Sequence, residues 1–63
     1  MGEITINEVK KKIEEILRER EWITYSELLK YLPYPAPLIS DALMLLLKEE
    51  KISRRGRYLY YKR

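Results

Sequence analysis

The side chains best suited to chemistry lie near the C-terminus, where cations gather without counter-charges. Residues 51–63 contain six basic residues and no acidic one: Lys51, Arg54, Arg55, Arg57, Lys62 and Arg63. Residues 1–50 contain seven basic and ten acidic side chains, so a segment of net charge +6 adjoins one of −3. Clustered guanidinium and ammonium groups attract polyanions. We interpret the last segment as a polyanion-binding element, with a solvated basic tail as the alternative.

Aromatic rings are interleaved with these cations. Tyr58, Tyr60 and Tyr61 follow Arg57 in the sequence, and alternation of this kind is typical of a β-strand. Aromatic rings in a strand either pack on a core or stack on nucleic-acid bases. We expect these three rings to pack beneath a sheet.

The composition excludes several classes of enzyme. The chain has no Cys and no His, which rules out Ser-His, Cys-His and zinc-hydrolase chemistry. Glu14, Glu15 and Glu19 fall on the polar side of a helical pattern without a convergent partner. We therefore predict a binding protein that is not an enzyme and that uses no metal, cofactor or small-molecule substrate.

Two capping boxes mark the helices that must position the basic segment. Thr5-Ile6-Asn7-Glu8 and Thr24-Tyr25-Ser26-Glu27 each place a hydroxyl three residues before a glutamate. They predict helices over residues 6–20 and 25–32. The buried face expected for the first helix consists of Ile6, Val9, Ile13, Ile16 and Leu17. Leu28 is expected to point inward from the second.

A proline cluster separates the second helix from a third. Pro33–Pro37 predicts a turn, and prolines in a first helical turn favour a helix over residues 36–50. The inward face expected for it consists of Ile39, Ala42, Leu43, Leu46 and Glu50. Residues 51–61 are typical of a hairpin that turns at Arg55-Gly56, because glycine supplies the positive φ of a tight turn.

The remaining features define one small domain. Residues 1–63 are predicted to form a single α+β unit, with Trp22 filling its core and a possible short strand near that residue. No segment approaches the roughly 20 apolar residues of a membrane span, and no signal pattern opens the chain, which favours a cytoplasmic protein.

Few amide side chains and abundant Glu, Lys and Arg favour a source that lives at high temperature.

This order of elements resembles a winged helix-turn-helix domain, in particular small archaeal DNA-binding proteins of that superfamily. Residues 23–28 are similar to the strand and second-helix opening of the family. Residues 39–52 are similar to its third helix and first wing strand. The resemblance implies that the third helix enters a major groove and that the hairpin forms a wing.

Only part of the third helix suits a groove. The outward positions implied by the resemblance are Pro37, Leu38, Ser40, Asp41, Met44, Leu45 and Lys48. Ser40 and Lys48 can contact nucleic acid. Pro37, Leu38, Met44 and Leu45 instead predict an apolar strip for a protein partner or a second copy. Alternatively, the N-terminal segment covers Leu38 or Leu45 through Ile4, or the Pro33–Pro37 turn does.

These observations lead to one main hypothesis and two alternatives. The main hypothesis is a duplex-DNA-binding regulator or chromatin-associated protein. Its predicted site residues are Arg54, Arg55, Gly56, Arg57, Lys62, Arg63, Ser40 and Lys48. The first alternative is a protein-interaction or homodimerisation module that uses the third helix. The second is an RNA-binding winged helix, because that fold also serves RNA.

Overall fold

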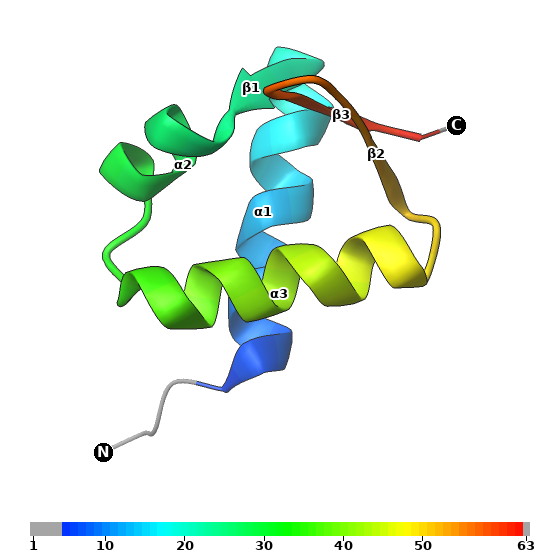
Figure 1. Ribbon diagram of the computed structural model, residues 1–63. Helices are drawn as coiled ribbons and strands as arrows, with labels where there is room; N and C mark the ends of the chain where they lie inside the picture. Colours follow the sequence, from blue (N-terminus) through cyan, green and yellow to red (C-terminus); the bar gives the residue numbers. More distant parts are fainter. Residues whose placement is uncertain (1–4, 63) are drawn as a thin grey trace.

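The structure, a computed structural model, describes residues 5–62. Ile4 and Arg63, both named above, lie outside these residues. The described elements are, in order, α1 (Ile6–Arg20), β1 (Trp22–Thr24), α2 (Tyr25–Tyr31), α3 (Ala36–Lys48), β2 (Ile52–Arg55) and β3 (Tyr58–Tyr61), shown in Figure 1. The architecture is α+β and has the layout of a winged helix-turn-helix, as the sequence predicts.

Hydroxyl caps begin the first two helices. Thr5 Oγ1 accepts a hydrogen bond of 3.2 Å from the amide of Glu8, and Thr24 Oγ1 accepts one of 3.3 Å from the amide of Glu27. Each bond satisfies an amide that the first helical turn leaves without a partner. Prolines replace the hydroxyl in α3, where Pro35 occupies the cap position. The predicted starts of all three helices are therefore confirmed.

The end of α3 differs from the prediction. The helix ends at Lys48, and Glu50 has a φ of 62°. The amide of Lys51 donates to the carbonyl of Leu46 at 3.0 Å, and the amide of Glu50 donates to that of Leu47 at 3.1 Å. These two bonds form a Schellman motif, which ends a helix with one left-handed residue. Glu50 is exposed, so its predicted place on the inward face is wrong.

The strands form one antiparallel sheet in the order β1-β3-β2. Arg55 lies opposite Tyr58, so the hairpin loop is Gly56-Arg57, one residue later than predicted. Gly56 has a φ of 64°, whereas Arg57 is not among the described residues with positive φ. A positive φ at the first loop position alone is the pattern of a type II′ turn, which matches the twist of the two strands.

The core lies between the three helices and one face of the sheet. Its buried side chains are Val9, Ile13, Leu17, Ile23, Leu28, Leu32, Ile39, Ala42, Leu43, Leu46, Ile52 and Leu59. Figure 1 shows α3 crossing α1, with which it packs, and the sheet at one end of α1. Ile6 and Ile16 are only half-buried at the edge of this core.

Trp22 corrects the prediction that it fills the core. Its side chain is 52% exposed, and its ring forms a T-shaped contact with Tyr58 at 5.2 Å between centroids. Successive residues of a strand point to opposite faces, so burial of Ile23 directs Trp22 outward. Tyr58 is exposed and Tyr60 is half-buried on the same outer face, so the prediction that they pack beneath the sheet is wrong. Tyr61 packs against the core as expected.

Candidate nucleic-acid interface

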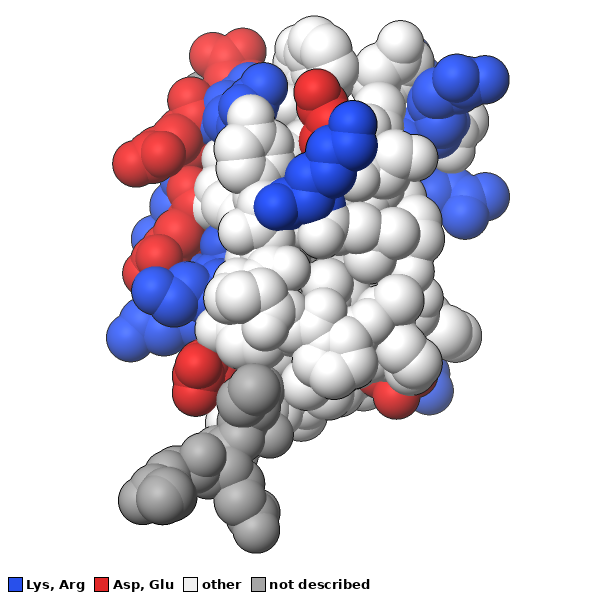
Figure 2. Space-filling model, turned by 90° about the vertical axis from the view of Figure 1, so that its left-hand side faces the viewer, with Lys and Arg blue, Asp and Glu red and all other residues white. Residues whose placement is uncertain are grey.

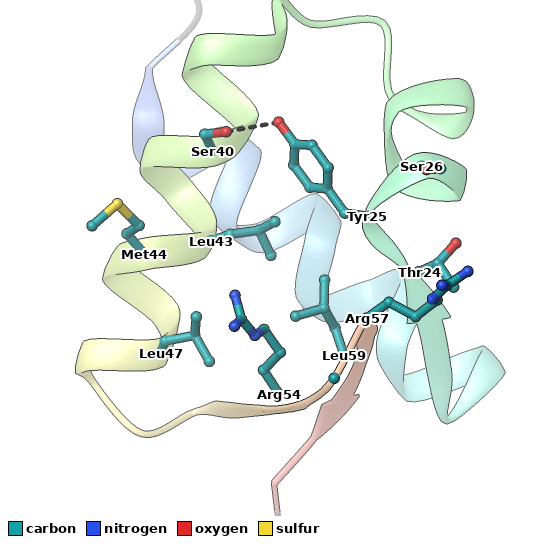
Figure 3. Close-up of a pocket in the computed structure, with 11 residues that line it drawn as sticks. Thr24, Tyr25, Ser26, Ser40, Leu43, Met44, Leu47, Arg54, Arg57 and Leu59 are labelled. Carbon is teal, nitrogen blue, oxygen red and sulfur yellow. Dashed lines mark hydrogen bonds between the residues drawn. The ribbon is translucent and has the colours of Figure 1, made fainter.

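A hollow separates α3 from the hairpin and contains two of the predicted arginines. We call it the wing hollow and define it by Thr24, Tyr25, Ser26, Ser40, Leu43, Met44, Leu47, Arg54, Gly56, Arg57 and Leu59. Figure 3 shows Arg54 reaching from the hairpin toward α3 and Ser40 on the opposite side. Residues far apart in the sequence thus converge on one surface, and none of those lining it is acidic.

Strand register separates Arg54 from Arg55. Arg54 lies opposite Leu59, which is buried, so both belong to the core side of the sheet. Arg55 lies opposite Tyr58, which is exposed on the outer side. Directly opposite residues share a face, so the two neighbouring arginines leave the hairpin in opposite directions. The structure therefore divides the predicted basic tip between two surfaces.

Ser40 is already engaged within the wing hollow. Its hydroxyl and that of Tyr25 lie 2.7 Å apart in a partly buried hydrogen bond. A serine hydroxyl offers one donor and two acceptor positions, so this bond leaves capacity for a further contact. The bond also ties α2 to α3 and holds the tyrosine hydroxyl at the wall of the hollow.

Sequence reasoning missed six residues of this surface. Thr24, Tyr25 and Ser26 reach it from the start of α2, and Leu43, Leu47 and Leu59 also line it. The second capping box could have indicated the first three, because outward hydroxyls in a helix-turn-helix lie beside the third helix. Leu47 carries no such signal, because an apolar residue next to Leu46 is equally consistent with the core.

Charge within the basic segment is uneven. Lys51 lies 4.0 Å from Glu49, and Lys62 lies 3.8 Å from Glu50, so both lysines are paired near the base of the hairpin. Within residues 5–62, no ion pair involves Arg54, Arg55 or Arg57. Figure 2 shows mixed acidic and basic side chains along one edge and basic side chains alone high on the opposite edge. Lys62 is thus separated from the arginines with which the sequence groups it.

Glu49 links this base to α1. Lys10 Nζ donates to Glu49 Oε2 at 2.7 Å. This hydrogen bond lowers the pKa of Glu49; desolvation opposes the change, and the charges of Lys10 and Lys51 add to it. A carboxylate held in this way keeps its charge and neutralises nearby lysines, so the base of the hairpin is electrostatically balanced.

A second hollow lies on the outer side of α3. We call it the helix hollow and define it by Ile6, Asp41, Met44, Leu45, Leu47 and Lys48. Met44 is 67% exposed, and Pro37 is also exposed. Leu38 and Leu45 are only half-exposed, and Leu38 packs against the core. The apolar strip is therefore narrower than predicted, and Lys48 lies in it rather than beside Arg54 and Ser40.

None of the described helices is both long and apolar enough to cross a membrane.

Comparisons with known proteins place this geometry in a family. No family model matches the chain, and no curated protein matches it either. The chain is similar to the solution structure of a DNA-binding protein from Sulfolobus islandicus, with 59% identity and a TM-score of 0.79. The match covers 87% of this chain and 95% of the other. The chain therefore belongs to the winged helix-turn-helix superfamily and, within it, to the family of this Sulfolobus islandicus protein.

Proposed function

We propose that this protein binds duplex DNA through the wing hollow. The observation that carries the proposal is the convergence of Arg54 and Arg57 with the α3 residue Ser40 on a surface without acidic side chains. Arg54 reaches toward α3, whereas Arg57 extends on the side of Thr24 (Figure 3). Two arginines without ion pairs at one hollow suit a strand of phosphates that lies in it. The related protein from Sulfolobus islandicus binds DNA, which supports the same class of ligand here.

The contacts expected are mainly to the phosphate backbone. Ser40 can bond a base edge or a phosphate, whereas Met44 and Leu47 can offer only apolar contact, which suits a thymine methyl group. Because few groups on α3 can read bases, sequence preference should be modest. These properties suit a transcriptional regulator or a chromatin-associated binding protein, and no part of the proposal requires catalysis.

A salt titration with paired variants tests the proposal. Replacing both Arg54 and Arg57 by Ala should weaken duplex binding and reduce the slope of log affinity against log salt by about 1.8, or 0.9 for each lost phosphate contact. The matched control replaces Lys11 and Lys12, exposed residues of α1, and should change neither quantity much. An unchanged slope in the arginine variant would refute the wing hollow as the site.

RNA is the competing nucleic acid. The same titration with structured RNA compares the two ligands, because A-form helices present a deep, narrow major groove that side chains cannot read. Tighter binding to structured RNA than to a duplex of equal length would replace the DNA proposal with the RNA alternative.

Self-association through α3 is a second candidate, favoured by the exposure of Met44. Asp41 and Lys48 lie on either side of Met44, seven residues apart in one helix. In an antiparallel pair of α3 helices related by a two-fold axis, each Asp41 would face the partner's Lys48. Replacing Met44 by Lys should leave a folded monomer. Wild-type protein that sediments as a monomer at millimolar concentration would exclude this candidate.

A further inference from the structure

The outer side of the sheet carries a group of side chains that, apart from Thr24, do not line the wing hollow. Register and alternation place six residues on this face, which we call the outer sheet face: Trp22, Thr24, Ser53, Arg55, Tyr58 and Tyr60. Three are aromatic, two carry hydroxyls, one is a cation and none is acidic. This composition arises from all three strands and is not apparent in any one of them.

The aromatic residues of this face are exposed beyond what packing requires. Trp22 is 52% and Tyr58 46% exposed, and none of the six residues is buried. The T-shaped contact between Trp22 and Tyr58, with an interplanar angle of 85°, joins β1 to β3 while both residues stay about half exposed. Large accessible rings held on a rigid sheet are a surface on which bases can stack.

Charge around the face favours a nucleic acid as its occupant. Arg55 belongs to the face and forms no ion pair within the described residues. Arg57, in the adjoining loop, lines the wing hollow instead. Glu21 is beside Trp22 and borders a neighbouring hollow with Arg18 and Tyr60. It adjoins β1, whereas Arg55 belongs to β2 at the opposite edge of the sheet. An anionic ligand can therefore approach Arg55 from the edge of the sheet opposite Glu21.

The small size of the outer sheet face also favours a nucleic acid over a protein as its ligand. A stable protein interface needs roughly 20–30 residues on each side, whereas this face offers six. Neighbouring strands are about 4.8 Å apart, so three strands provide room for only a few rings or bases. A duplex keeps its base faces stacked inside, and only a single strand can present them.

We propose that the outer sheet face binds single-stranded nucleic acid, with bases stacked on Trp22 and Tyr58 and a phosphate held by Arg55. This site goes beyond the proposed duplex function, because it uses the opposite side of the hairpin from Arg54. Two nucleic-acid surfaces on one wing would let the protein hold a duplex and an adjoining unpaired strand together.

Trp22 is the only tryptophan of the chain, so its fluorescence reports directly on this face. The probe is a thymidylate oligomer of about 10 nucleotides, within the usual range of single-strand sites. Titration should quench the Trp22 emission. A uridylate oligomer of equal length separates DNA from RNA, and quenching by either one supports the proposal. Emission that neither oligomer changes at saturation would overturn it.

Variants separate stacking from charge. Tyr58→Ala should weaken oligomer binding about 5- to 150-fold, the range for loss of one stacked base. Tyr58→Phe should restore most of the affinity, because stacking needs the ring and not the hydroxyl. The matched control is Tyr31→Ala, since Tyr31 is 53% exposed but lies on α2 against Arg20. Circular dichroism confirms that each variant is folded. Wild-type affinity in folded Tyr58→Ala would overturn the proposal.

The two proposals fail independently. Replacing Arg54 and Arg57 should reduce duplex affinity and largely preserve quenching by the thymidylate oligomer, whereas Tyr58→Ala should do the reverse. Loss of both activities in the arginine variant, with neither changed by Tyr58→Ala, would assign all nucleic-acid binding to the wing hollow. Capture of a protein partner by the outer sheet face, without any oligomer binding, would also overturn the single-strand proposal.

Discussion

Arg54 and Arg55 are adjacent in the chain, yet the sheet directs them to opposite surfaces. Arg54 lines the wing hollow and Arg55 lies on the outer sheet face with Tyr58. Single substitutions are therefore not equivalent. Arg54→Ala should weaken duplex binding several-fold and reduce the salt slope by about 0.9, and Arg55→Ala should change duplex binding less than twofold. Filter binding at several salt concentrations measures both. Equal losses of duplex affinity in the two variants would contradict the assignment of Arg54 and Arg55 to opposite faces of the sheet.

Gly56 is important to the backbone of the loop rather than to packing. A Cβ added at this residue would meet no atom within 4 Å, but its φ is 64°. Gly56→Ala should therefore destabilise the fold by about 1 kcal/mol through left-handed strain alone. Gly56→Asn should cost less, because asparagine tolerates this region. Urea denaturation measures both, and a neutral alanine variant would show that the loop relaxes to another turn.

At the scale of the elements, the end of α3 offers a stabilising change. Glu50 occupies the left-handed position of the Schellman motif, where glycine is the usual residue. Glu50→Gly removes strain of about 1–2 kcal/mol and adds unfolded-state entropy worth about 0.5–1 kcal/mol. The net gain should be about 0.5–1 kcal/mol, because the exposed pair with Lys62 contributes little. A lower unfolding midpoint in urea would contradict this account of the cap.

At the scale of the whole molecule, stability depends on a core of few side chains. Ile13 is fully buried, and replacing it by Ala should cost about 2–5 kcal/mol. A domain of 63 residues has a total stability of about 3–9 kcal/mol at 0.05–0.15 kcal/mol per residue. The variant should therefore lose a large part of its stability and melt at a much lower temperature than the wild type. Ile13→Val is the control and should cost about 0.5–1.5 kcal/mol. Similar melting temperatures for the two variants would mean that neighbouring side chains move into the space left by the isoleucine and fill the cavity.

The pair between Lys10 and Glu49 joins α1 to the end of α3 and makes stability depend on pH. The hydrogen bond from Lys10 lowers the pKa of Glu49 in the folded state. The contribution of this pair to the free energy of unfolding is complete above the unfolded-state glutamate pKa of about 4.3. It is lost as the pH falls through the lower pKa of Glu49 in the folded state. The difference in unfolding midpoint between wild type and Glu49→Gln should therefore shrink from about pH 7 to about pH 3. A constant difference would exclude the ion pair as its cause.

Much of the fold could be predicted because its signals are local. A cap joins a hydroxyl to an amide three residues away, so the sequences around Thr5 and Thr24 are sufficient to start α1 and α2. A proline cluster likewise needs no distant partner to begin α3. The end of α3 had no such signal, because the left-handed residue that stops it is glutamate rather than glycine.

The candidate site could be predicted only in part, because its geometry depends on pairing between distant strands. The sequence by itself determined the basic segment and the hairpin, and the family resemblance implied the exposure of Met44, which is confirmed. Tertiary structure decided that the loop is Gly56-Arg57, and a shift of one residue in a strand exchanges the faces of its side chains. It also decided that Trp22 points outward, because the core covers only the side of the sheet that carries Ile23. The strand register and the side of the sheet that the core covers together decide that Arg54 faces α3 and Arg55 faces the aromatic rings. Both depend on contacts between distant segments, so no single segment encodes them.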